Sequence, residues 1–128
     1  MNLKCMFLLV LLATNLAYNQ TEGVTQIKSD EEFKDIITSK GPKVIAIGAQ
    51  RNQFMAILFH ELASIQGDKL FKSVEYYYAL VGDIPKAVAA YNLHGLMVAV
   101  FNQGNCLDRI HAPIGINDLY AKLQVALG

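Results

Sequence analysis

An uninterrupted apolar run, VIAIGA, occupies residues 44–49 and limits the folds open to this chain more than any other stretch. A strand with one face in water alternates apolar and polar residues, whereas a strand covered on both faces does not. The sequence therefore predicts a central strand at 44–49 that lies between two layers of helices.

Helical patterns flank this strand on both sides. Ser29 and Glu32 have the spacing of a capping box, and apolar residues then recur at helical steps, which predicts a helix over residues 30–39. A second apolar stripe predicts a helix from about residue 52 to residue 67.

The second half of the chain continues this alternation and ends in a hairpin and a helix. Its patterns predict, in order, a strand at 74–81, a short helix capped by Asp83, a strand at 96–101, a turn at 102–105, a strand at 106–112 and a final helix capped by Asn117. A short first strand is expected at 24–27. Tyr76 and Tyr78 should pack on one face of their strand and Tyr77 on the other.

Strands that alternate with helices form parallel, right-handed crossovers, and a late hairpin adds an antiparallel edge. We therefore expect an α/β fold with a mixed central sheet between helical layers.

The N-terminal residues 1–17 read MNLKCMFLLVLLATNLA. The basic Lys4 precedes an apolar core too short to span a bilayer, a pattern typical of a secretory signal peptide cleaved near Ala17. Residues 18–128 then suffice for one domain. We expect the protein to be secreted or to lie in the lumen of the endoplasmic reticulum, with no membrane span after cleavage.

Asn19 lies in an Asn-x-Thr acceptor for glycosylation.

Charge and histidine spacing exclude several classes of function. The sequence has 11 Lys and Arg residues and 11 Asp and Glu residues, without a basic cluster. Nucleic-acid binders carry such clusters, so nucleic acid is not an expected partner. His60, His94 and His111 lie on different predicted elements without metal-ligand spacing, so we expect neither a metal nor another cofactor.

Two cysteines occur in the sequence, Cys5 and Cys106, and Cys5 leaves with the leader. A single remaining thiol cannot form an internal disulfide. Two interpretations of Cys106 stay open: a buried packing residue, and a thiol that forms an intermolecular disulfide with a partner.

The chain resembles the thioredoxin-like superfamily from about Thr25 to Leu127, in the order of its elements and in the segments IKSDEEFKDII, KVIAIGA, FMAILFHELASI and LMVAVFNQGN. The segments VIAIGAQRNQF and AAYNLHGLMVAVFNQGN are most similar to the redox-inactive b-type domains of protein disulfide isomerases. The resemblance implies a three-layer α/β/α fold with a mixed central sheet, a C-terminal β-hairpin and a terminal helix.

Catalytic members of this superfamily carry Cys-x-x-Cys where the central strand meets the following helix, because helix N-terminal amides stabilise a thiolate. The corresponding loop here is Gln50-Arg51-Asn52-Gln53, which contains no sulfur. The family also places a cis-proline before the strand that faces this loop, and the matching stretch is Gly95-Leu96-Met97. The resemblance therefore implies a chain without thiol-disulfide oxidoreductase activity and without catalytic residues.

The function we expect is binding of protein or peptide partners. By family analogy, the contact surface comprises the degenerate loop and the facing segment, namely Gln50, Arg51, Asn52, Gln53, His94, Gly95, Leu96 and Met97. Two alternatives stay open: a redox accessory that acts through Cys106 in trans, and a small extracellular effector on a thioredoxin scaffold. The oligomeric state does not follow from the sequence.

Overall fold

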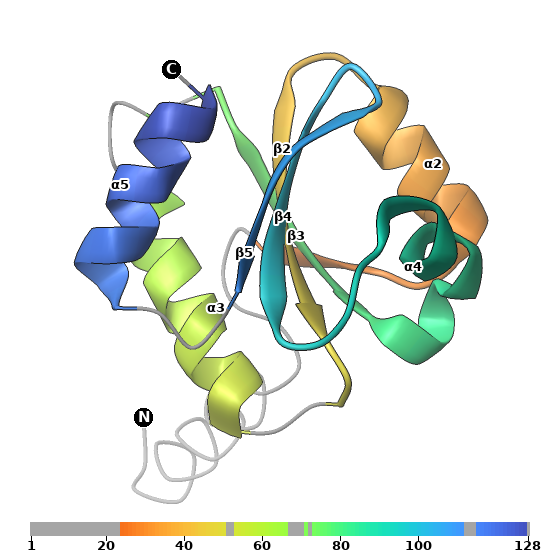
Figure 1. Ribbon diagram of the computed structural model, residues 1–128, viewed down its shortest axis with the longest axis horizontal. Coiled ribbons are helices and arrows are strands. Elements are labelled where there is room, and N and C mark those ends of the chain that lie inside the picture. The colour runs from red at the N-terminus through yellow and green to blue at the C-terminus, as the bar shows by residue number, and fades with distance from the viewer. Residues whose placement is uncertain (1–23, 51–52, 67–70, 72, 112–114, 128) are drawn as a thin grey trace, which may run out of the picture.

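The computed structural model describes residues 24–50, 53–66, 71, 73–111 and 115–127. Its elements, in chain order, are β1 (Val24–Ile27), α2 (Asp30–Thr38), β2 (Pro42–Gly48), α3 (Gln53–Gln66), β3 (Glu75–Leu80), a 3₁₀ turn (Val81–Asp83), α4 (Pro85–Tyr91), β4 (Met97–Asn102), β5 (Asn105–His111) and α5 (Ile116–Leu127) (Figure 1). The expected order of strands and helices is confirmed, and only the 3₁₀ turn was not predicted. The signal peptide and Asn19 lie outside the described residues.

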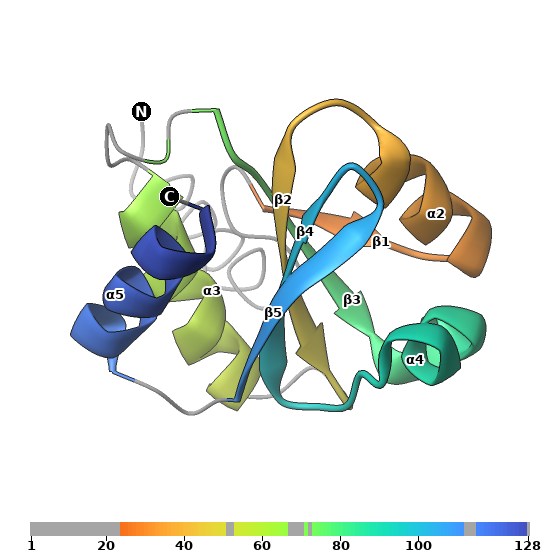
Figure 2. The ribbon, with the colours of Figure 1, turned by 45° about the horizontal axis from the view of Figure 1, so that its top comes forward.

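The five strands form one mixed sheet in the order β1-β3-β2-β4-β5. Strands β1, β3 and β2 run parallel, whereas β4 and β5 are antiparallel to their neighbours. Helices α2 and α4 cover one face and α3 and α5 cover the other (Figures 1 and 2). This confirms the three-layer α/β/α fold with its C-terminal hairpin.

Strand β2 contributes alternate side chains to two separate cores. Val44 and Ala46 face α3 and α5, whereas Ile45 and Ile47 face α2 and α4, and all four are buried. This arrangement explains why the run at 44–49 is apolar without alternation.

The three consecutive tyrosines of β3 divide between the two faces as predicted. Tyr76 and Tyr78 join the core beneath α3 and α5, where the ring centres of Tyr78 and Phe59 lie 4.4 Å apart. Tyr77 lies half-buried on the opposite face. The aromatic residues therefore fill both cores.

A fully buried cation, Lys43, lies at the start of β2. Its Nζ donates to the carbonyls of Lys40 at 2.7 Å and Gly41 at 2.9 Å, and lies 3.1 Å from the carboxylate of Glu75. A buried charge is tolerated only when it is paired and hydrogen-bonded. Tyr77 also donates to Glu75, and burial together with this carboxylate raises the pKa of Tyr77.

The sequence predicted that Asp83 caps helix α4, and this prediction is wrong. The cap comes instead from the neighbouring helix α2. Asp83 ends the 3₁₀ turn, and Ile84 occupies the N-cap without a side-chain hydrogen bond. The carboxylate of Asp30, in the first turn of α2, accepts from the backbone N–H of Lys86 at 3.1 Å and of Ala87 at 2.9 Å. Two N–H groups in the first turn of α4, which have no acceptor within the helix, are thus bonded by a side chain of α2. These hydrogen bonds hold α4 against α2.

The start of the final helix also differs from the prediction. Helix α5 begins at Ile116, and the N–H of Leu119 donates to the carbonyl of Gly115 at 2.9 Å. Asn117 therefore lies inside the first turn and cannot act as the cap. By contrast, the predicted cap of α2 is confirmed, since Ser29 Oγ accepts from the Glu32 N–H at 3.1 Å.

Replacing Asp30 with Ala should reduce the free energy of unfolding by about 1–2 kcal/mol, because two amides at the start of α4 lose their acceptor. Urea denaturation of both variants provides the measurement, with Glu31→Ala as the control. Glu31 is an exposed carboxylate in the same turn of α2, so its removal changes the net charge equally without uncapping α4. Equal losses in the two variants would contradict the role of Asp30.

Candidate functional site

The predicted contact surface lies at one end of the sheet. Strand β2 ends there, β4 begins there and β5 ends there, because Ile47 pairs with Met97 and Met97 pairs with His111. We call this end the corner face, and its described exposed or half-buried residues are Ala49, Gln50, Gln53, His94, Gly95, Leu96 and His111.

The structure gathers the described part of the predicted surface at this end. Gln50 follows β2 and Gln53 begins α3, and both are exposed. Leu96 is half-buried, whereas Met97 is 1% exposed and lies beneath the corner face. The predicted residues Arg51 and Asn52 lie outside the described residues.

Gly95 lies directly against the end of β2. A Cβ atom built on Gly95 would lie 2.5 Å from the backbone nitrogen of Ala49 and 2.9 Å from the carbonyl carbon of Gly48. The peptide bond between Gly95 and Leu96 is cis, although no proline is present. The proline that the family places here is absent, as the sequence shows.

His94 and His111 meet at the outer part of the corner face, which the sequence did not predict. Their ring centres lie 4.9 Å apart, with the ring planes inclined by 17°. Both side chains are exposed, and the backbone N–H of His94 donates to the Sδ of Met97 at 3.5 Å. Among the residues that the structure describes, no group of three or more His, Cys, Asp or Glu side chains is arranged to hold a metal ion.

Cys106 lies at the other end of β5, five residues from His111. The distance is roughly 16 Å along an extended strand. The thiol is half-buried, donates to the carbonyl of Asp108 at 3.6 Å and accepts from Nη1 of Arg109 at 3.7 Å. Cys106 is therefore remote from the corner face.

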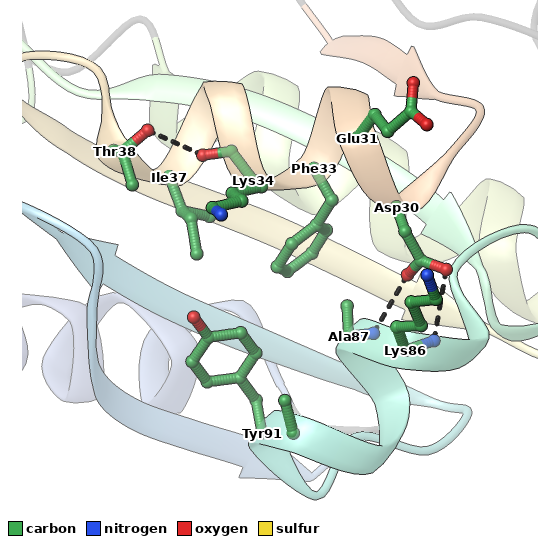
Figure 3. A pocket seen from close by; sticks show the side chains of 10 residues that line it. Asp30, Glu31, Phe33, Lys34, Ile37, Thr38, Lys86, Ala87 and Tyr91 are labelled. Carbon is green, nitrogen blue, oxygen red and sulfur yellow. Dashed lines mark hydrogen bonds between the residues drawn. The ribbon is translucent and has the colours of Figure 1, made fainter.

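A groove between α2 and α4 was missed by sequence analysis. It has a volume of about 370 Å³ and is lined by Asp30, Glu31, Phe33, Lys34, Ile37, Thr38, Lys86, Ala87, Ala90 and Tyr91. Figure 3 shows Phe33 and Ile37 projecting from α2 toward Tyr91 on α4, while the carboxylate of Glu31 points away. The floor is therefore apolar and the rim carries charged side chains.

An aromatic cluster holds the wall of this groove in place. The ring centre of Tyr91 lies 6.0 Å from that of Phe33 and 5.1 Å from that of Phe101. The carbonyl of Tyr91 also accepts from Nη1 of Arg109 at 3.4 Å. The helical spacing of Phe33 and Ile37 was visible in the sequence, but their proximity to Tyr91 depends on how α2 and α4 pack.

Comparison with known proteins identifies the fold. No protein-family profile and no curated protein matches the sequence. A designed protein matches with a TM-score of 0.71 and 20% identity, over 83% of this chain and 99% of its own. An oxidised thioredoxin from Plasmodium falciparum matches with a TM-score of 0.70 and 13% identity, over 82% of this chain and 99% of its own. A thioredoxin from Malassezia sympodialis matches with a TM-score of 0.65 and 18% identity, over 81% and 87% respectively.

At sequence identities of 13–20%, these structural matches establish the fold and no more. The chain has a thioredoxin-like fold. Within the described ranges, no helix is both long and apolar enough to cross a membrane.

Replacing Gly95 with Ala should destabilise the protein by about 1–3 kcal/mol, because the new methyl group would collide with the backbone of Gly48 and Ala49. Gly82→Ala is the control, since a Cβ atom there meets nothing within 4 Å. Thermal unfolding of both variants measures the effect. A Gly95 variant as stable as the Gly82 variant would mean that the contact with β2 is not maintained.

Proposed function

We propose that this chain is a redox-inactive member of the thioredoxin-like superfamily, similar to the b-type domains of protein disulfide isomerases, that binds protein or peptide partners. The groove between α2 and α4 is the observation that carries this proposal. The leader at residues 1–17 supports a protein that is secreted or lies in the lumen of the endoplasmic reticulum.

The loss of redox chemistry is supported by the residues at the end of β2. Gln50, Arg51, Asn52 and Gln53 carry amide and guanidinium groups, none of which exchanges disulfides. Cys106 stands at the opposite end of β5. A single thiol at that position has no second cysteine in the mature chain with which to complete a disulfide cycle.

The shape and chemistry of the groove favour an apolar side chain of an unfolded or extended polypeptide. A volume of about 370 Å³ falls within the usual range for ligand sites and admits one or two such side chains. The aromatic wall supplies rigid contact area at Tyr91. The exposed ammonium groups of Lys34 and Lys86 lie at the rim, where they are available to backbone carbonyls of a bound peptide.

The corner face is the second surface of the proposal. Gln50, Gln53 and His94 present exposed donors and acceptors beside the half-buried Leu96. A mixture of apolar area and hydrogen-bonding groups is typical of surfaces that contact proteins.

Filling the groove should weaken peptide binding. Ala90→Trp places an indole in the groove, because Ala90 is exposed and lines it, and should weaken binding by at least about tenfold, equivalent to about 1.4 kcal/mol. Fluorescence anisotropy with reduced, carboxymethylated α-lactalbumin, an unfolded polypeptide, measures the dissociation constant.

Ala89→Trp is the matched control, since Ala89 is exposed on the same helix but does not line the groove. Normal binding by the Ala90 variant would exclude the groove as the site. A wild-type protein that binds no unfolded polypeptide would overturn the proposed function itself.

A redox accessory that acts through Cys106 is the second candidate. The contact between the Arg109 guanidinium and the sulfur favours it, because reactive thiols lie in electropositive, partly exposed surroundings. We nevertheless expect insulin reduction by dithiothreitol to proceed no faster with the protein than with buffer, and Cys106→Ser to change nothing. A faster reaction that Cys106→Ser removes would establish the redox role, and the intact mass without reductant would show whether a mixed disulfide forms.

A further inference from the structure

We propose that His94 and His111 form a binding site for a divalent transition-metal ion of the class that prefers imidazole ligands, such as Zn²⁺ or Cu²⁺. The two residues belong to different elements, the loop after α4 and the last position of β5, and no single helix or strand motif contains both. The fold alone brings their rings to 4.9 Å.

The distance between the rings matches that of two imidazoles on one ion. A nitrogen about 2.1 Å from zinc places its ring centre about 3.2 Å from the metal, so two imidazoles on a tetrahedral ion have ring centres roughly 5.2 Å apart. The observed 4.9 Å is close to this separation.

The orientation of the rings requires a rotation of the side chains. The planes are inclined by 17° and stacked, so both rings must turn before their nitrogens face a common ion. Both side chains are exposed, and the terminal torsion of histidine is broad, so this turn meets no packed core. Water completes the coordination, because the described residues offer no third side chain at this point.

Charged side chains precede His111 on β5. Arg109 lies two residues before His111, and its guanidinium is held by the carbonyl of Tyr91 and the sulfur of Cys106. The carboxylate of Asp108 accepts from the backbone N–H of Arg109 at 2.8 Å. The guanidinium of Arg109 is thus directed toward Cys106, at the opposite end of β5 from His111.

A bound ion would connect the loop that carries His94 to the end of β5. Gly95, the next residue in that loop, lies against the end of β2. The ion would therefore hold three segments of the corner face together: the end of β2, the loop before β4 and the end of β5. This inference does not depend on the groove or on the proposed peptide binding.

Isothermal titration of the untagged protein with ZnCl₂ at about pH 7.5 tests the site. We expect one ion per chain, and at least about tenfold weaker binding in His94→Ala and in His111→Ala, since even an outer-shell partner of a metal typically contributes that factor. His60→Ala is the control, because His60 is exposed on α3 and outside the pair. The His60→Ala variant should bind zinc with the same affinity as the wild type.

Paramagnetic broadening by Cu²⁺ in a ¹H–¹⁵N spectrum locates the ion independently, and should affect residues around 94 and 111 first. Unchanged zinc affinity in either single variant would overturn the proposal. So would equal losses in all three variants, which would indicate diffuse binding to surface histidines. Melting temperatures without zinc verify that each variant is folded. Zinc should raise the melting temperature of the wild type and of His60→Ala, but not that of His94→Ala or His111→Ala.

Discussion

Strand β2 is buried on both faces, and the other elements are arranged around it. It pairs with β3 on one side and with β4 on the other, so its backbone groups are satisfied within the sheet. Its alternate side chains enter the two cores. At the start of β2, the buried ammonium of Lys43 donates to the carbonyls of Lys40 and Gly41. At the end of β2, Gly95 lies against Gly48. The corner face therefore has a rigid base.

The groove depends on a second constraint, the attachment of α4 to α2. Asp30 is the first residue of α2, and its carboxylate caps α4. The rings of Phe33 on α2 and Tyr91 on α4 pack against each other. The tip of the hairpin is fixed to the same region, because the N–H of Gly104 donates to the carbonyl of Ile37 at 2.8 Å. A short helix of this kind would have little stability by itself, so the contacts with α2 position the groove wall.

Gln50 follows β2 and Gln53 begins α3, with His94 and His111 at the same end of the sheet. Catalytic members of the superfamily carry Cys-x-x-Cys between the corresponding strand and helix, whereas residues 50–53 contain no sulfur here. A scaffold of this kind supports binding without disulfide exchange, since function resides in the side chains and not in the fold. The groove and the histidine pair lie at different places on the molecule, so each can be tested without disturbing the other.

Much of this structure followed from local patterns. The apolar run at 44–49, the cap at Ser29 and the turn at 102–105 depend on neighbours in the sequence, and so does the lack of sulfur at residues 50–53. The turn confirms the point: Gln103 and Gly104 both adopt positive φ, as a tight hairpin requires. Asp83 and Asn117 were assigned as caps from the same local rules, and the structure places neither of them at a cap.

The tertiary structure alone decided the pairing of His94 with His111, the cap at Asp30 and the groove. The hairpin turn pairs Asn102 with Asn105, and a regular ladder would place Met97 opposite Ile110. A bulge between Val100 and Phe101 shifts that register by one residue and brings His111 to Met97, beside His94. The sequence determined the elements because their patterns are local. It left the sites undetermined because they join residues whose approach is set by the bulge and by the packing of α2 against α4.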